Sequence, residues 1–275
     1  MKRLLLIPFV FILTTCSKVQ NDGYPAYIYI DHIDLQTDYI KHGNNQFDGR
    51  AVWIEAGSED LGAWELPARI PILQEGKVTI RIFPGIAKKA ISDFGKYNFV
   101  NFYSQDVDLK KTIIDTIRPL VTYKDSVKVP YHEDFEKNPT FDNMNIVDNS
   151  SGNALRGLKM GKLLLNTSSA STEVKVYSKN EIPVPYGKEA YLEFDYSSLN
   201  DTSILYANLF FPTSNDNVVL GVIKCSSTWK RAYFPIDQTV GAKFGEAFKV
   251  MFVLIRKDGQ LESSVLIDNV RVIYQ

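Results

Sequence analysis

This sequence has almost no net charge, few long apolar runs, and none of the common catalytic motifs. The formal net charge is −1, and the lysines and arginines are dispersed, which argues against nucleic acid or an anionic membrane patch as a partner. There is no G-x-S-x-G turn, no glycine-rich phosphate loop and no H-E-x-x-H pair. The three histidines, His32, His42 and His132, are scattered along the chain. We therefore predict a protein that is not an enzyme.

The apolar run with the character of a targeting segment lies at the start of the chain. Leu4–Leu13 follows the basic residues Lys2 and Arg3. A helix of this length reaches only part of the way across a bilayer core of about 30 Å, so the run does not span a membrane. The pattern predicts a signal peptide over residues 1–15.

Cys16 follows that run directly, after Leu13-Thr14-Thr15. The arrangement resembles a bacterial lipobox, although Thr15 stands where that motif usually has glycine, alanine or serine. The resemblance implies acyl chains on Cys16, a lipidated tether over 16–24, and an outer-membrane lipoprotein of the cell envelope, in either leaflet. An ordinary secretory signal with an incidental cysteine is the alternative. If Cys16 is acylated, Cys225 is the remaining thiol, and its apolar surroundings predict a buried, inert side chain.

Beyond residue 24 the apolar runs are short, rich in valine, isoleucine and aromatics, and separated by turn residues. In Lys77–Ile82 the apolar residues alternate with polar ones, as in a strand with one buried face. We predict an all-β chain of two β-sandwich domains. A small immunoglobulin-like sandwich is expected over 25–123, a linker over 124–131, and a larger jelly roll over 132–275, because prolines 119 and 130 disfavour a strand running through both.

Each predicted domain carries a family resemblance. In the first, Val52–Gly57 and Asp60–Pro67 resemble the hairpin of PEGA-type surface domains, and the block also resembles N-terminal regions of Bacteroidota lipoproteins. In the second, the order of Asp134-Phe135-Glu136, Thr228-Trp229-Lys230 and Ile267–Val272 is similar to galactose-binding-like jelly rolls, which include carbohydrate-binding modules.

The second resemblance implies a structural calcium where the first and last strands of the jelly roll meet. Carboxylate and carbonyl oxygens are the ligands that calcium prefers. By this resemblance the candidate ligands are Glu136 and Asp268, with Asp134 behind them. The alternative is that Asp268 caps a turn or pairs with a neighbouring base.

Four aromatic residues are candidate sugar platforms, because the apolar C–H face of a sugar ring stacks on an aromatic ring. They are Trp64, Tyr177, Tyr196 and Tyr206. Trp64, beside a glycine turn, is expected to be exposed, and Tyr196 and Tyr206 flank the polar turn 197–203. Core packing and cross-strand pairing are the alternative for each of them.

Glu193-Phe194-Asp195 resembles the Glu-x-Asp-x-x-Glu strand of laminarinase-like glycosidases, but Ser198 stands where the acid/base glutamate would be. We therefore interpret Glu193 and Asp195 as the polar outer face of a strand whose Leu192 and Phe194 point inward.

Together these patterns predict a noncatalytic envelope lipoprotein that binds a glycan or a partner protein through its jelly roll. A structural, adhesin-like or accessory subunit of an outer-membrane complex is the alternative, and a glycan-active enzyme with a nonlocal site is a third. Asp115-Thr116-Ile117 and Asp125-Ser126-Val127 also resemble the O-glycosylation motif of Bacteroidota. The alternative for these two tripeptides is a plain strand end and a linker.

Overall fold

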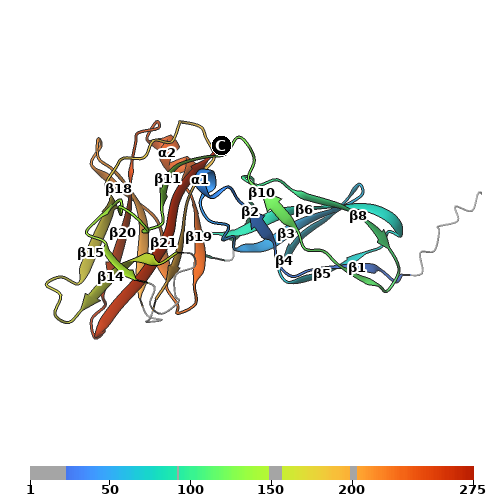
Figure 1. Ribbon diagram of the computed structural model, residues 1–275, viewed down its shortest axis with the longest axis horizontal. Coiled ribbons are helices and arrows are strands. Elements are labelled where there is room, and N and C mark those ends of the chain that lie inside the picture. Colours follow the sequence, from blue (N-terminus) through green and yellow to red (C-terminus); the bar gives the residue numbers. More distant parts are fainter. Residues whose placement is uncertain (1–22, 92, 149–156, 199–202) are drawn as a thin grey trace, which may run out of the picture.

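The structure is a computed structural model that describes residues 23–91, 93–148, 157–198 and 203–275. These residues form almost only strands, arranged in two sandwiches along the long axis of the molecule (Figure 1). The predicted all-β class with two sandwich domains is confirmed. The predicted signal peptide and Cys16 lie outside the described residues. Within the described part of the chain, no helix is long and apolar enough to cross a membrane.

The N-terminal sandwich packs a sheet built on β3, β4, β6, β7 and β8 against the small sheets β5-β1-β9 and β10-β2. Alternation along β6 places Val78, Ile80 and Ile82 in the core, as the sequence predicts. The elements are β1 (Ala26–Ile30), β2 (Asp34–Gln36), α1 (Tyr39–His42), β3 (Gly49–Ala56), β4 (Glu59–Glu65), β5 (Ala68–Ile72), β6 (Gly76–Lys88), β7 (Asp93–Lys96), β8 (Tyr103–Leu109), β9 (Ile114–Thr116) and β10 (Leu120–Thr122).

The C-terminal sandwich packs two sheets face to face. In the first, the strand order is β13-β14-β21-β16-β19, with β11 also paired to β21; in the second it is β12-β15-β20-β17-β18. The elements are β11 (Lys128–Glu133), β12 (Phe141–Asp142), β13 (Asn145–Asp148), β14 (Lys159–Asn166), β15 (Glu173–Ser178), β16 (Ala190–Ser197), β17 (Ile204–Phe211), β18 (Asp216–Lys224), β19 (Lys230–Pro235), α2 (Asp237–Ala242), β20 (Lys249–Ile255) and β21 (Glu262–Tyr274).

The predicted linker differs from the structure in its second half. Strand β11 begins at Lys128, and Tyr131 already pairs with Val272 of β21. Pro130, which cannot donate a backbone hydrogen bond, lies where the register between Lys128 and Tyr131 is irregular. The proline is therefore accommodated inside the strand rather than ending it.

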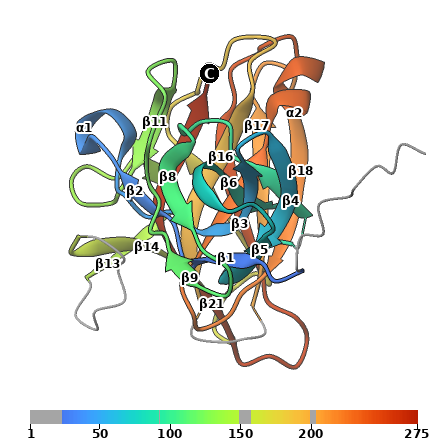
Figure 2. The same cartoon turned by 90° about the vertical axis from the view of Figure 1, so that its right-hand side faces the viewer.

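The N-terminal sandwich lies over the outer face of the first jelly-roll sheet, as the end-on view also shows (Figure 2). Tyr191, Tyr233 and Ile273 point out of that sheet and are buried in the N-terminal core. One parallel bridge, between Tyr233 of β19 and Lys88 of β6, joins the sheets of the two domains. Every residue of β16 is consequently buried, because one of its faces packs in each core. The two sandwiches thus share a continuous apolar contact.

Cys225 is a free, buried cysteine, and burial raises the pKa of its thiol to about 12. The predicted burial of this thiol is confirmed, and the raised pKa favours the protonated form, which is a poor nucleophile.

Candidate functional site

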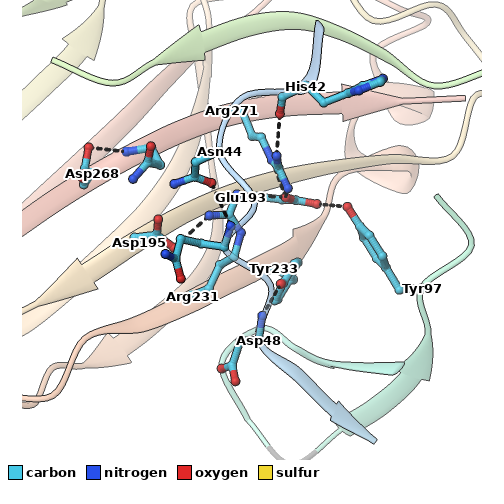
Figure 3. A network of polar contacts seen from close by, with 12 residues as sticks. His42, Asn44, Asp48, Tyr97, Glu193, Asp195, Arg231, Tyr233, Asp268 and Arg271 are labelled. Carbon is cyan, nitrogen blue, oxygen red and sulfur yellow. Dashed lines mark hydrogen bonds and ion pairs between the residues drawn. The ribbon is translucent and has the colours of Figure 1, made fainter. Parts of the chain in front are cut away.

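A buried ionic network occupies the outer face of the first jelly-roll sheet. Glu193 of β16 accepts hydrogen bonds from Arg271 of β21, at 2.7 Å from Nε, and from Arg231 of β19, at 3.2 Å. Arg231 also donates to Asp195, at 2.8 Å. All four side chains are buried, and two guanidinium groups face two carboxyl groups (Figure 3).

The N-terminal sandwich completes this network. Tyr97 donates its hydroxyl hydrogen to Glu193, and Arg271 donates to the hydroxyl oxygen of Tyr123 and, at 2.6 Å, to the carbonyl of His42 (Figure 3). The hydroxyl of Tyr233 accepts from the backbone N–H of Asp48 at 3.0 Å. Groups of the N-terminal sandwich therefore meet part of the hydrogen-bonding capacity of the network, although Nε of Arg231 and Oδ2 of Asp195 are buried without a partner.

Charge in the network is distributed unevenly. Burial alone would raise the pKa of Glu193, but the guanidinium groups of Arg271 and Arg231 outweigh it and lower that pKa. Burial prevails at Asp195 and raises its pKa, although Arg231 opposes the shift. Glu193 and Asp195 share the outer face of β16, as predicted, and the N-terminal sandwich covers this face.

We expect Glu193→Ala to lower the free energy of unfolding by about 3–5 kcal/mol, because it leaves two buried arginines without their shared carboxylate. Chemical denaturation of the whole protein measures this loss. Asp106→Ala is the control, since Asp106 forms an exposed ion pair with Lys77 at 3.2 Å, and exposed ion pairs contribute little to stability. Equal midpoints for the two variants would contradict a structural role of the network.

The three predicted calcium ligands lie near one another beside this network. Asp134 accepts from the hydroxyl of Tyr39 at 2.5 Å, and Glu136 accepts from the backbone N–H groups of Leu158 and Lys159 at 2.7 and 2.9 Å. Asp268 accepts from the N–H of Asn269, which follows it in the chain. At least one oxygen of each carboxylate is therefore engaged by a protein donor.

Asp268 is the member of the group with an unsatisfied oxygen. Its Oδ2 is buried without a hydrogen-bond partner, as is Oδ2 of Asp195, the residue opposite it on β16. Burial, followed by the negative charge of Asp195, raises the pKa of Asp268 to about 8. A proton or a bound cation would each neutralise this carboxylate. The described residues contain no group of three or more His, Cys, Asp or Glu side chains arranged to hold a metal ion, and calcium stays a prediction.

Chelation and one substitution distinguish the proton from the cation. If calcium is bound, excess chelator and Asp268→Asn each lower the melting temperature of the whole protein. If a proton neutralises the site, chelator has no effect. Asp268→Asn then raises stability at neutral pH, because a group whose pKa is raised on folding must take up a proton there, whereas asparagine is neutral without one. A melting temperature that chelator leaves unchanged would contradict the calcium prediction.

Two of the four predicted sugar platforms are not placed to stack on a ligand. Tyr196 is buried in the jelly-roll core, where its ring lies 6.0 Å from that of Phe194, so its predicted role is wrong. Trp64 is half-buried rather than exposed, since its indole N–H donates to the carbonyl of Leu61 at 2.9 Å and its ring packs against the N-terminal core. It lies in the other domain, away from the remaining candidates.

Tyr177 and Tyr206, in contrast, share the outer face of the second jelly-roll sheet. Tyr177 of β15 lies opposite Met251 of β20, and Tyr206 of β17 lies opposite Val253 of the same strand. Their Cα atoms are therefore about 12 Å apart, from the spacing of strands and residues in a sheet. Both rings are half-buried, and each projects beside buried apolar side chains of β20.

Phe210 extends this aromatic face and was missed in the sequence. Its ring makes an edge-to-face contact with Tyr177, at 5.6 Å between centroids. The signal was present, because Phe210 lies four residues after Tyr206 on β17 and so points to the same side of the sheet. We call Tyr177, Tyr206 and Phe210 the aromatic face.

Polar groups lie among these rings. Asn208, between Tyr206 and Phe210 on β17, donates to Asn217 at 3.1 Å, and its own amide oxygen is buried without a partner. Lys175 and Glu173 pair at 2.7 Å on β15, which β20 separates from β17. The face combines rings that can stack with charged groups that can meet hydroxyls.

The chain is distantly similar to several solved structures. No protein-family model and no curated protein matches the chain. Among solved structures, TmCBM61 in complex with β-1,4-galactotriose is 11% identical, with 55% of this chain and 90% of that chain covered and a TM-score of 0.34. The CBM22-1 xylan-binding domain of Paenibacillus barcinonensis Xyn10C is 8% identical, with 54% and 94% covered and a TM-score of 0.38. The K3 adhesin domain of Lys-gingipain from Porphyromonas gingivalis is 12% identical, with 54% and 99% covered and a TM-score of 0.38.

Proposed function

We propose that the protein is a noncatalytic glycan-binding protein and that the aromatic face of its jelly roll receives the glycan. The observation that carries this proposal is the convergence of Tyr177, Phe210 and Tyr206 on one sheet face that no other part of the described chain covers. The opposite sheet of the same sandwich is closed by the N-terminal domain. One recognition surface of the jelly roll is thus free.

The chemistry of the aromatic face suits an extended saccharide. Stacked rings favour flat, weakly polar surfaces, and the C–H faces of sugars present them at intervals along a chain. A ligand that touches both Tyr177 and Tyr206 must extend over about 12 Å, which favours several linked sugars over a single one. Lys175 and Glu173, whose paired side chains are partly exposed on β15, supply charged groups for sugar hydroxyls beside the rings.

Tyr206→Ala should weaken glycan binding about tenfold, or about 1.4 kcal/mol, because it removes a central stacking ring. Affinity electrophoresis of the whole protein through gels containing individual neutral and acidic polysaccharides identifies the ligand, and titration calorimetry gives the affinity. Tyr186→Ala is the control: Tyr186 is an exposed tyrosine of the same domain outside the aromatic face.

Equal affinities for these two variants would contradict binding at the aromatic face. If no polysaccharide retains the wild-type protein, glycan binding itself fails. Co-purification with an outer-membrane complex would then support the alternative of an adhesin or accessory subunit, in which the same rings contact protein.

The cellular setting is part of the proposal: a lipid on Cys16 anchors the protein in the cell envelope.

The two hydroxyl residues of the glycosylation tripeptides, Thr116 and Ser126, are exposed, so an enzyme can reach them. Intact mass of natively expressed protein tests both modifications. We expect a chain that starts at Cys16 and carries acyl mass, with hexose units lost on replacing Thr116 and Ser126 by alanine. A mass without acyl groups would contradict the anchor, and one without hexose would contradict the glycosylation.

A further inference from the structure

Four exposed apolar side chains gather at the end of the N-terminal sandwich where β1 begins. Tyr24 is 67% exposed, Leu73 56%, Ile113 49% and Ile114 46%. Exposed apolar residues are ordinary when they are scattered, but a cluster of them marks a contact surface. We call these four residues the β1 tip.

Backbone pairing holds the members of the β1 tip together. The carbonyl of Pro25 accepts from Thr112 at 2.9 Å, and the N–H of Tyr27 donates to Ile113 at 2.9 Å. On the other side of β1, Ala26 pairs with Ile72, the residue before Leu73. The tip is therefore formed by β1 and both of its neighbours, at the end of the molecule remote from the jelly roll (Figure 1).

The charges beside the tip are largely balanced. Lys111 pairs with Glu75 at 2.7 Å, and Lys110 lies 3.5 Å from Asp108. A partner for this surface is therefore one that accepts apolar side chains and does not require a strong opposite charge. The interfacial zone of a zwitterionic phospholipid bilayer has this character.

The chain that precedes the tip limits what can cover it. Residues 17–22 read Ser-Lys-Val-Gln-Asn-Asp, so the segment offers a single apolar side chain, Val19. It is also short: seven residues lie between Cys16 and Tyr24, and a chain of eight residue steps spans at most about 29 Å when fully extended. An acyl anchor on Cys16 would hold the tip within that distance of the lipid.

We propose that the β1 tip rests on the bilayer to which the chain is anchored, so that the N-terminal sandwich stands on the membrane and carries the jelly roll away from it. The proposal rests on the lipid anchor proposed for Cys16. A short tether gives its two ends an effective concentration in the millimolar range, so a contact too weak to recruit free protein becomes well populated once the chain is anchored.

Chemical tethering tests the contact whether or not the cell acylates Cys16. A chain that begins at Cys16, in a Cys225→Ala background, is coupled through its thiol to a maleimide lipid in phosphatidylcholine vesicles. The reference is the same chain capped with a soluble maleimide. Hydrogen exchange is then compared over peptides covering residues 24–27, 73–75 and 110–114. We expect exchange there to slow at least about twofold on tethering, as it must when the contact is half populated.

Matched variants locate the contact. Leu73→Ser combined with Ile113→Ser should abolish the slowing, because it removes two of the four apolar side chains. Phe244→Ser should retain it, since Phe244 is 87% exposed but belongs to the jelly roll. Equal exchange in tethered and capped protein, or slowing confined to the jelly roll, would overturn the proposal. Failure of the cellular anchor is a separate outcome, read from the intact mass.

Discussion

The buried pairing of Arg271 and Arg231 with Glu193 sets the relation between the two domains. Taking such charges out of water costs several kcal/mol per ion, and their mutual attraction offsets that cost only when geometry and hydrogen bonds are good. Here two further donors of Arg271 are met by Tyr123 and by the carbonyl of His42, both from the other domain, whereas Nε of Arg231 is buried without a partner. The network therefore contributes less to net stability than to selecting one arrangement of the two sandwiches, because any displacement leaves a buried charge unpaired.

A fixed arrangement gives the elongated shape a functional consequence. The aromatic face and the β1 tip lie on different domains, and between them stands an ionic network flanked by the shared core of Tyr191, Tyr233 and Ile273. A flexible linker would let the jelly roll take any orientation to a surface on which the β1 tip rests. The buried junction instead holds the two sandwiches in one arrangement, so the orientation of the aromatic face is fixed relative to the β1 tip.

Sequence patterns predicted correctly which side chains are buried where burial depends on a single strand. They failed where burial or proximity depends on another strand or domain. Alternation identified the buried side of β6, and the same parity could have corrected Tyr196, which shares a face with the inward Leu192 and Phe194. The burial of Glu193 could not be predicted from the neighbouring sequence, because the residues that cover it, such as Tyr97, lie far away in the chain. The proximity of Tyr177 and Tyr206 could not be predicted either. Strands β15 and β17 are brought together because each pairs with β20, which follows both of them in the sequence.

The two outer faces of the jelly roll reverse the usual distribution of residues. Charged groups on the first sheet are buried, whereas aromatic rings on the second stay partly open to solvent. Hydrogen bonds are directional and ions cannot tolerate poor pairing, so a charged face specifies one partner, and the N-terminal sandwich is that partner. Rings tolerate sliding and small changes of partner, which suits repetitive polymers. The charged face and the aromatic face are therefore not interchangeable. A junction formed by aromatic rings would let the two domains shift, whereas a binding face formed by charged groups would require a ligand with matching opposite charges.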